Sequence, residues 1–252
     1  MLSVIIPTYN NKSLTIRNIH LLDVYLRKHF KKHEIILVDD GSRLQEIAAE
    51  EELPADVTHI RLPKNRGKGF AIQQGMAKAR GDCCIFTDID LPYALEAFPY
   101  AYDLIVNKNI NVVVGDRKLA ISKCNIKISV FRRIASYVFS KLVTLFIIGG
   151  VFDFQCGFKA FSKRLASLLF PLLKVKRFGF DVEIYYLLLK NNIMMKKIPV
   201  CLNNNSDSTV QPIMHGIETL FSVIKIVVNY KRGKYGALEL SSLENVPYWE
   251  SF

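Results

Sequence analysis

Two short acidic clusters each follow directly on an apolar, strand-like run of residues. Asp39-Asp40-Gly41-Ser42 follows the run at 34–38, and Asp88-Ile89-Asp90 follows the run at 83–87. In an open parallel sheet a ligand binds beyond the carboxyl ends of the strands, so carboxylates at these positions face the ligand crevice. Acidic residues after strands also cap helices and fill turns, and one cluster alone would indicate little. Two such clusters favour an open α/β sheet with an acidic crevice.

The second cluster has the spacing of a metal-binding pair. Side chains alternate along an extended chain, so Asp88 and Asp90 lie on the same side of it. Two carboxylates supply the hard oxygen ligands that Mg²⁺ or Mn²⁺ prefers when the ion already carries a diphosphate. We therefore expect Asp88 and Asp90 to bind a metal and a nucleoside diphosphate.

Strand-like and helical segments alternate along the first half of the chain. The strand-like runs lie at residues 2–6, 34–38, 58–62, 83–87 and 111–114. Between them, Ile19, Leu22, Leu26 and Phe30 recur at helical spacing, and a second helix is expected over 67–80. This alternation predicts βαβ units, hence a mostly parallel central sheet flanked by helices. The length of 252 residues suits one large α/β domain.

The charge and the apolar content indicate an anionic partner and a lipid surface. The formal net charge is +11, and half of the residues are hydrophobic. Residues 117–152 hold seven Lys or Arg and no Asp or Glu, interleaved with aliphatic and aromatic side chains. Nucleic-acid surfaces combine their cations with polar residues and stacking aromatics, so this pattern favours a membrane surface over nucleic acid.

The C-terminal part changes character toward long apolar helices. We expect a domain over residues 1–212, followed over 213–252 by an amphipathic helix and a tail; packing on the sheet and packing on lipid are both compatible with that helix. No run reaches the roughly 20 apolar residues that a bilayer requires, so the expected attachment is peripheral. The N-terminus lacks a basic signal region, which predicts a cytoplasmic protein on the cytosolic face of a membrane. Five cysteines without a CxxC pair suggest reduced thiols.

Six motifs occur in a characteristic order. They read VIIPTYN (4–10), VDDGS (38–42), GKGFA (67–71), DID (88–90), DFQCGFK (153–159) and FGFDVE (178–183). Over about residues 2–210 the chain resembles the family two glycosyltransferases with a GT-A fold. Within that family it is similar to the dolichyl-phosphate glucose and mannose synthases and their bacterial polyprenyl-phosphate counterparts. The GKG motif lacks the spacing of a dinucleotide fold or a P-loop, which counts against dehydrogenases and NTPases.

The resemblance implies roles for individual residues. Pro7, Tyr9, Asn10, Asp39 and Asp40 would hold the nucleoside. Gly67, Lys68 and Gly69 would approach the donor, while Asp88 and Asp90 would bind Mg²⁺ or Mn²⁺ and the diphosphate. Arg117 and Arg132 or Arg133 would bind the acceptor phosphate. The sugar and acceptor pockets would be lined by Asp153, Gln155, Lys159, Asp181 and Glu183.

The implied activity is metal-dependent, inverting transfer of a hexose from a nucleotide sugar, preferably a UDP-sugar, to a polyprenyl phosphate. One alternative is transfer to a sugar hydroxyl, for which Asp153 or Asp181 would serve as the required base. Another is a catalytically silent, membrane-docked module that binds nucleotide sugars. The chain departs from the family after Ile198-Pro199-Val200, where the usual acceptor-loop lysine is missing.

Overall fold

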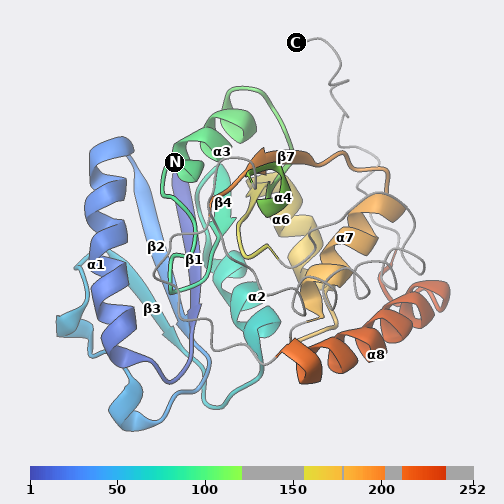
Figure 1. Cartoon of the computed structure of the whole chain (residues 1–252), viewed down its shortest axis with the longest axis horizontal. Coiled ribbons are helices and arrows are strands. Elements are labelled where there is room, and N and C mark those ends of the chain that lie inside the picture. Colours follow the sequence, from blue (N-terminus) through green and yellow to red (C-terminus); the bar gives the residue numbers. More distant parts are fainter. Residues whose placement is uncertain (121–155, 178, 202–211, 237–252) are drawn as a thin grey trace.

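The computed structural model describes residues 1–120, 156–177, 179–201 and 212–236. Within these residues a seven-stranded sheet has the order β3-β2-β1-β4-β6-β5-β7 (Figure 1). The described ladders are parallel except those of β6, which runs antiparallel to both β4 and β5. The expectation of a mostly parallel sheet flanked by helices is confirmed.

The elements have the following bounds. The strands are β1 Leu2–Thr8, β2 His33–Asp39, β3 Val57–Arg61, β4 Cys83–Phe86, β5 Val112–Asp116, β6 Lys159–Ser162 and β7 Lys196–Pro199. The α-helices are α1 Lys12–His29, α2 Lys68–Lys78, α3 Ala97–Val106, α4 Arg117–Ala120, α6 Lys163–Leu169, α7 Phe180–Lys190 and α8 Pro212–Lys231. Short 3₁₀ turns lie at η1 Leu44–Glu46, η2 Glu50–Glu52 and η3 Phe170–Leu172.

The five predicted strands are all present, because continuous apolar runs suit strands that are covered on both faces. Every residue of β1 and β4 is buried. Strands β6 (KAFS) and β7 (KKIP) are not among the predicted ones; each is only four residues long and begins with lysine. Such short segments carry no readable alternation of apolar and polar residues.

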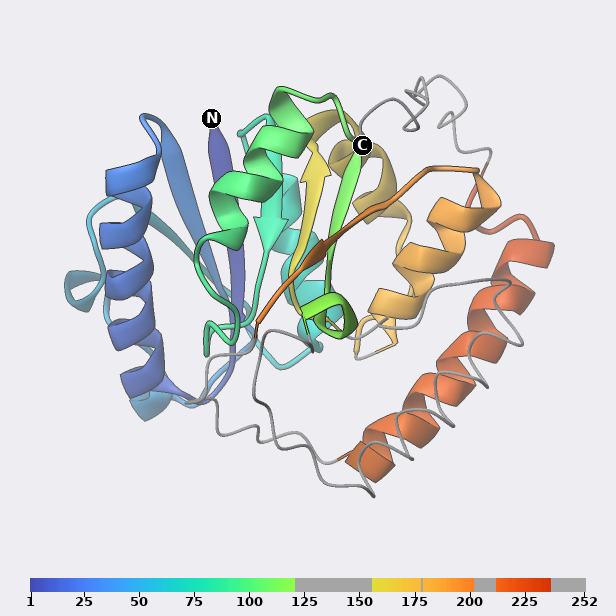
Figure 2. The same ribbon diagram turned by 45° about the horizontal axis from the view of Figure 1, so that its top comes forward.

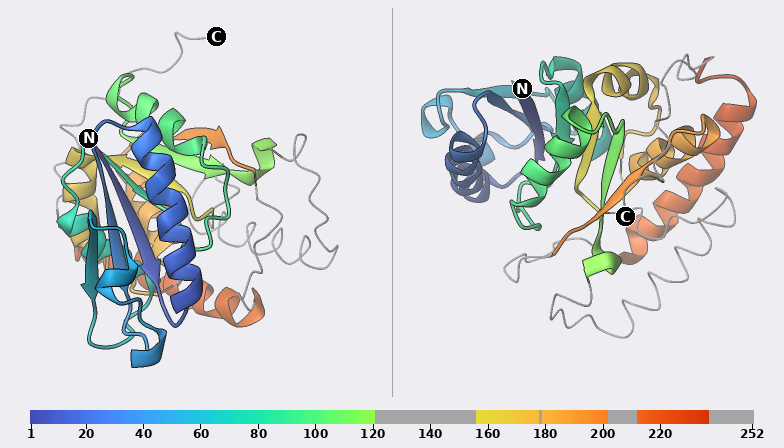
Figure 3. Two further views of the ribbon diagram at one scale, coloured as in Figure 1. Left: turned by 90° about the vertical axis from the view of Figure 1, so that its left-hand side faces the viewer. Right: turned by 90° about the horizontal axis from the view of Figure 1, so that it is seen from above.

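Helices cover both faces of the sheet (Figures 2 and 3). On one face, α1 and α3 pack over Val4, Ile35 and Ile85; the predicted stripe of α1 is buried there. On the other face, α2, α6 and α7 pack over Ile5 and Ile36. The result is a three-layer α/β/α arrangement.

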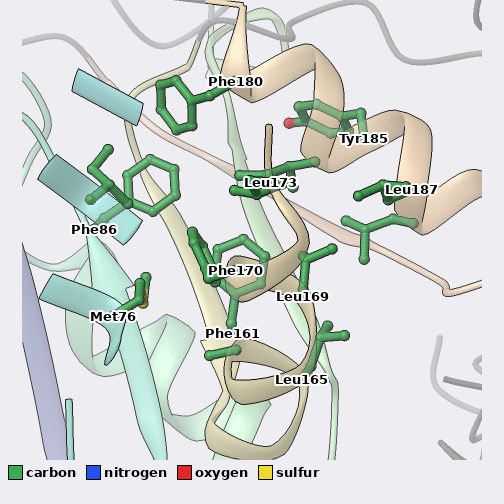
Figure 4. Packing of buried hydrophobic residues seen from close by; sticks show 14 of the residues in the cluster. Met76, Phe86, Phe161, Leu165, Leu169, Phe170, Leu173, Phe180, Tyr185 and Leu187 are labelled. Atoms are coloured by element: carbon green, nitrogen blue, oxygen red, sulfur yellow. The ribbon is translucent and has the colours of Figure 1, made fainter. Parts of the chain in front are cut away.

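An aromatic cluster lies beneath the end of β4 (Figure 4). The ring centroid of Phe86 is 5.8 Å from that of Phe180 and 6.4 Å from that of Phe170, and the rings of Phe161 and Phe170 are 5.1 Å apart. Phe86 stands just before Thr87-Asp88, and Phe180 stands just before Asp181. Close packing of these rings therefore fixes the backbone that carries two acidic site residues.

Helix α8 confirms the predicted C-terminal helix and has two apolar faces. Val223 and Ile226 are fully buried in the same core as α7, whereas Phe221, Ile224 and Val228 are exposed. The helix therefore packs on the domain and also presents an unburied apolar stripe. Within the described part of the chain, no helix has both the length and the apolarity that a membrane crossing requires.

The described cysteines agree only in part with the expectation of reduced thiols. Cys83, Cys84 and Cys156 are buried free thiols. Cys201 is disulfide-bonded, so the expectation is wrong for this residue. Most of the basic segment 117–152 lies outside the described residues.

Candidate functional site

The sequence motifs meet at one edge of the sheet. Strand β1 is parallel to both β2 and β4. Strands β4 and β5 are both antiparallel to β6 and therefore run in the same direction as each other. The carboxyl ends of β1, β2, β4 and β5 thus share that edge. The antiparallel β6 begins where β4 ends, because Lys159 pairs with Phe86. The two acidic clusters therefore lie at the same edge of the sheet, beyond β2 and β4, which flank β1. This shared edge is what the sequence predicts.

The loops after β1 and β2 are locked together at the predicted nucleoside side. The backbone N–H of Asn10 donates to Ser42 Oγ at 2.7 Å, and the N–H of Arg43 donates to Asn10 Oδ1 at 2.9 Å. Asn10 has a φ of 50°, a conformation that asparagine tolerates better than most residues. Tyr9 is 48% exposed beside it. These contacts bring Tyr9 and Asn10 next to the Asp39 loop.

Pro7, which the resemblance assigns to the nucleoside site, lies inside β1 and not in the loop that follows it. Its side chain is buried, and it pairs in register with Val38. The ladder between β1 and β4 ends at Ile5, so the missing N–H of Pro7 removes no described ladder bond. Pro7 therefore supports the loop from within the sheet.

Asp39 and Asp40 both accept hydrogen bonds from the backbone. Asp39 Oδ1 accepts from the Ser42 N–H at 2.7 Å. Asp40 accepts from the N–H of Arg66 at 2.8 Å and of Gly67 at 2.7 Å, using one oxygen for each. Burial raises the pKa of Asp40 although both amides oppose that shift. Asp40 thus ties the end of β2 to the loop that leads into α2.

The two glycines of the GKG motif allow close packing. Gly67 has a φ of +100°, which few other residues adopt, and a Cβ on Gly69 would lie 2.6 Å from the Cβ of Phe180. The N–H of Phe70 also donates to the Lys176 carbonyl at 3.0 Å. The start of α2 therefore rests directly against the start of α7, and this contact brings Lys68 close to Asp181.

The Asp88–Asp90 pair forms the centre of the site. Lys68 Nζ makes a short ion pair with Asp88 Oδ1. Asp90 Oδ1 is buried and has no hydrogen-bond partner among the described residues. Burial raises the pKa of Asp90, and the neighbouring Asp88 carboxylate raises it further. A buried acceptor without a partner carries a desolvation penalty, which a ligand would relieve.

Three residues that the sequence analysis missed hold this pair in place. Asn18 of α1 donates its side-chain N–H to the Ile89 carbonyl at 2.8 Å. Gly157 donates its N–H to Tyr93 Oη at 2.9 Å, and a Cβ on Gly157 would lie 2.2 Å from Asp88 Oδ2. The only sequence signals were a polar residue beside the apolar stripe of α1 and a glycine within the DFQCGFK motif.

Asp181 forms a second, buried ion pair behind the first. Lys159 is fully buried, and its Nζ donates to Asp181 Oδ1 and to the Cys156 carbonyl, both at 2.7 Å. Burial raises the pKa of Asp181, although Lys159 and Lys68 oppose that shift. The structure therefore places Lys159 beneath the site, where it positions Asp181.

Glu183, which the resemblance also assigned to the pocket wall, is not part of this edge. It is fully buried and accepts hydrogen bonds from the N–H groups of Lys174 and Val175 and from the Tyr235 hydroxyl. Its role is to hold the segment before α7 and the residues after α8.

The acceptor side is described only in part. Arg117, half-buried, begins α4 directly after β5 and therefore stands at the same edge. Arg132, Arg133, Asp153 and Gln155, which the sequence analysis also assigned to the site, lie outside the described residues.

The residues present fit a divalent cation that arrives with a diphosphate. Among the described residues no group of three or more His, Cys, Asp or Glu side chains could hold an ion. Asp88 and the unpartnered oxygen of Asp90 supply two hard ligands, and Mg²⁺-type ions take their remaining ligands from water and substrate phosphates.

Comparison with known proteins agrees with this geometry. The glycosyl transferase family 2 model matches residues 3–170. Dolichyl-phosphate beta-glucosyltransferase of Dictyostelium discoideum is 32% identical over 246 residues, which cover 92% of this chain and 75% of the relative. The human protein of the same description is 31% identical over 255 residues, covering 93% and 77%.

Solved structures with the same fold are more distant in sequence. Glucosyl-3-phosphoglycerate synthase of Mycobacterium tuberculosis, solved with Mn²⁺, UDP-glucose and phosphoglyceric acid, aligns with a TM-score of 0.64 at 16% identity; the match covers 90% of this chain and 79% of that one. Mannosyl-3-phosphoglycerate synthase of Rubrobacter xylanophilus gives 0.61 at 14% identity, covering 93% and 74%. The fold, the acidic site at the sheet edge and the matched family together establish that this chain is a GT-A glycosyltransferase of glycosyl transferase family 2.

Proposed function

We propose that the enzyme transfers glucose from UDP-glucose to the phosphate of a polyprenyl lipid, with Mg²⁺ or Mn²⁺ held by Asp88 and Asp90. The observation that carries the proposal is the buried, unpartnered Asp90 Oδ1 beside Asp88 at the carboxyl edge of the sheet. The donor and acceptor follow the relatives described as dolichyl-phosphate beta-glucosyltransferases and the neighbour solved with UDP-glucose and Mn²⁺.

The chemistry suits a phosphate nucleophile. The second pKa of a phosphomonoester is about 6, so the acceptor is mostly dianionic at neutral pH and needs no general base. A phosphate oxygen forms a bond to the anomeric carbon from one side while the bond to the diphosphate breaks on the other, which inverts that carbon. The metal would neutralise charge on the departing diphosphate.

The protein's own contribution is to orient the two substrates. Tyr9, Asn10 and Asp39 face the nucleoside, and Arg117 binds the acceptor phosphate through its planar guanidinium.

The test is a donor and acceptor panel. Radiolabelled UDP-glucose and GDP-mannose are each incubated with a polyprenyl phosphate or an oligosaccharide, with and without a chelator. We expect label from UDP-glucose in the lipid fraction, loss of transfer with the chelator, and recovery on addition of Mn²⁺. Transfer to the oligosaccharide but not to the lipid would contradict the proposed acceptor, and full activity in the chelator would contradict the metal.

We further propose that residues 213–252 attach the catalytic domain, residues 1–212, to the cytosolic face of a membrane. In α8, Phe221, Ile224 and Val228 are 70%, 51% and 38% exposed, and their spacing places them on one side of the helix. The cations exposed nearby are Lys225, Lys231, Arg232 and Lys234. An apolar stripe with flanking cations suits an anionic lipid surface.

Vesicle flotation tests this attachment. The protein is mixed with vesicles of phosphatidylcholine, with or without phosphatidylserine, and Phe221→Asp is compared with the wild type. We expect binding only to the anionic vesicles and its loss in Phe221→Asp. Val24→Asp is the matched control, because Val24 is 69% exposed on α1, which covers the other face of the sheet. Equal flotation of all three proteins would contradict a role for the stripe.

A further inference from the structure

Lys68 occupies a position that helix stability does not explain. It is the first residue of α2, where no acidic residue stands in the first turn. The positive end of a helix dipole disfavours a cation at this place. The lysine side chain nevertheless turns to Asp88 and forms a short ion pair, with exposed side-chain fractions of 22% for Lys68 and 32% for Asp88. The carboxylates of the site, rather than the helix, account for its placement.

Lys68 carries a positive charge at neutral pH, as a lysine ammonium group ordinarily does. Its Nζ is paired with Asp88 Oδ1, and Asp90 and Asp181 add further negative charge around it. Asp88 and Asp90 with one ammonium group leave a single net negative charge at the metal position. A free divalent cation would therefore meet one carboxylate already occupied by a positive group.

We propose that Lys68 is an internal counter-cation that occupies Asp88 until the donor arrives, so that metal enters with the nucleotide diphosphate and not alone. This inference rests on the proposed metal-dependent transfer. An ammonium group and a divalent cation compete for the same carboxylate oxygen, and at close range they repel each other. The donor diphosphate offers Lys68 a replacement anion, and the exchange frees Asp88 for the metal.

The local structure permits this exchange by a side-chain movement alone. The backbone at the start of α2 is fixed, because Gly69 packs against Phe180 and the Phe70 N–H is bonded to the Lys176 carbonyl. The lysine stem, in contrast, has four flexible methylene groups. Asp181 also contributes negative charge to the field at Lys68, so a second carboxylate attracts the ammonium group when it leaves Asp88.

Mn²⁺ binding measured without turnover tests the proposal. Free Mn²⁺ is followed by electron paramagnetic resonance during titration of the full chain, with and without UDP. We expect the wild type to bind Mn²⁺ weakly alone and much more tightly with UDP. In Lys68→Met, the affinity for Mn²⁺ alone should rise on the order of 10-fold, and the enhancement by UDP should shrink. Lys68→Gln is the second variant in case the methionine protein folds poorly.

Two controls make the result specific. Lys78→Met removes the same charge at the exposed far end of α2 and should behave as wild type. In Lys68→Met/Asp88→Asn the gain should disappear, because the freed carboxylate is absent. If Mn²⁺ alone binds wild type and Lys68→Met equally while UDP still strengthens binding, the counter-cation role is overturned and the proposed function stands. If UDP never promotes Mn²⁺ binding in the wild type, both are overturned.

Discussion

The two acidic clusters look alike in the sequence but differ in how their oxygens are used. At the end of β2, both oxygens of Asp40 accept backbone N–H groups, from Arg66 and Gly67. After β4, Asp88 is paired with a lysine side chain, and Asp90 Oδ1 is buried without a partner. Asp40 of the first cluster therefore stabilises a loop, whereas the second cluster retains binding capacity for a ligand.

This difference shows where ligand-binding capacity resides in an acidic site. Backbone amides that satisfy a carboxylate fix its position but leave it little to offer a ligand. A buried oxygen without a partner is unfavourable in the free protein and becomes favourable only when a ligand binds. The unpartnered oxygen of Asp90 thus lowers the stability of the free protein slightly, and ligand binding relieves this loss. The two engaged oxygens of Asp40 cause no such loss.

The largest expected effect is that of Asp90→Asn. Removing this charge should reduce kcat/KM for glucosyl transfer by about 100-fold or more, since metal stabilisation of the leaving group contributes several kcal/mol. The melting temperature should stay the same or rise, because the buried, unpartnered Oδ1 then belongs to a neutral amide and not to a carboxylate. Steady-state kinetics and thermal unfolding measure the two effects. Asp56→Asn, at an exposed ion pair, is the control. Near-native activity of Asp90→Asn would contradict the view that the β4 cluster, unlike Asp40, binds the ligand.

Gly157→Ala should have the next largest effect. The new methyl carbon would lie only 2.2 Å from the present position of Asp88 Oδ2. The flexible Asp88 carboxylate must therefore turn away. Loss of the neighbouring groups that orient a metal ligand typically reduces metal affinity or activity by about 10- to 100-fold. Titration of Mn²⁺ in the presence of UDP measures the loss, and the fold should survive because only a side-chain end moves. Unchanged Mn²⁺ affinity would show that Asp88 is not confined by Gly157.

Asp40→Asn should act on stability more than on chemistry. An amide group can accept only through its oxygen, so either the Arg66 or the Gly67 N–H loses its acceptor. An unsatisfied buried donor lowers the free energy of unfolding by about 1–3 kcal/mol. In a chain of this size, each kcal/mol lowers the melting temperature by about 2–4 °C. We expect a lower melting temperature and a higher KM for UDP-glucose, with kcat close to wild type. A fall in kcat like that of Asp90→Asn would mean that both clusters serve the reaction.

The central strands were predictable from the sequence, because a continuous apolar run favours a strand that is buried on both faces. It also predicted that Asp39 and Asp88 share an edge, since parallel strands align their carboxyl ends. It could not predict β6, whose antiparallel pairing with β4 and β5 depends on contacts far apart in the chain. The same applies to Pro7, whose place inside β1 depends on where the neighbouring ladder ends.

Within the site, residue types were predictable and their hydrogen-bond partners were not. The resemblance assigned Lys159 and Asp181 to the pocket wall, but it gave no sign that they form a buried ion pair behind Lys68. Likewise, Asn18 and Gly157 act by bonding or crowding residues far along the chain. Such contacts arise from tertiary packing, which residue spacing along the chain does not encode.

The smallest expected effect on activity comes from Tyr235→Phe. This variant tests Glu183, whose oxygens, like those of Asp40, accept hydrogen bonds within the protein. The Tyr235 hydroxyl donates to Glu183, whose oxygens also accept the Lys174 and Val175 N–H groups. Loss of a hydrogen bond to a charged group should cost about 1.5–3 kcal/mol of stability, without changing kcat.

The pH dependence of this loss has a defined sign. Burial raises the pKa of Glu183, although Tyr235 and the two amides favour its charged form. The hydroxyl therefore stabilises the fold most where Glu183 is ionised, above that pKa, and the difference between wild type and Tyr235→Phe should shrink as the pH falls through it. Unfolding curves across pH measure the difference, with Tyr100→Phe, at a 47% exposed tyrosine, as the control. A difference that grows toward acid pH would mean that the hydroxyl stabilises the protonated carboxyl instead.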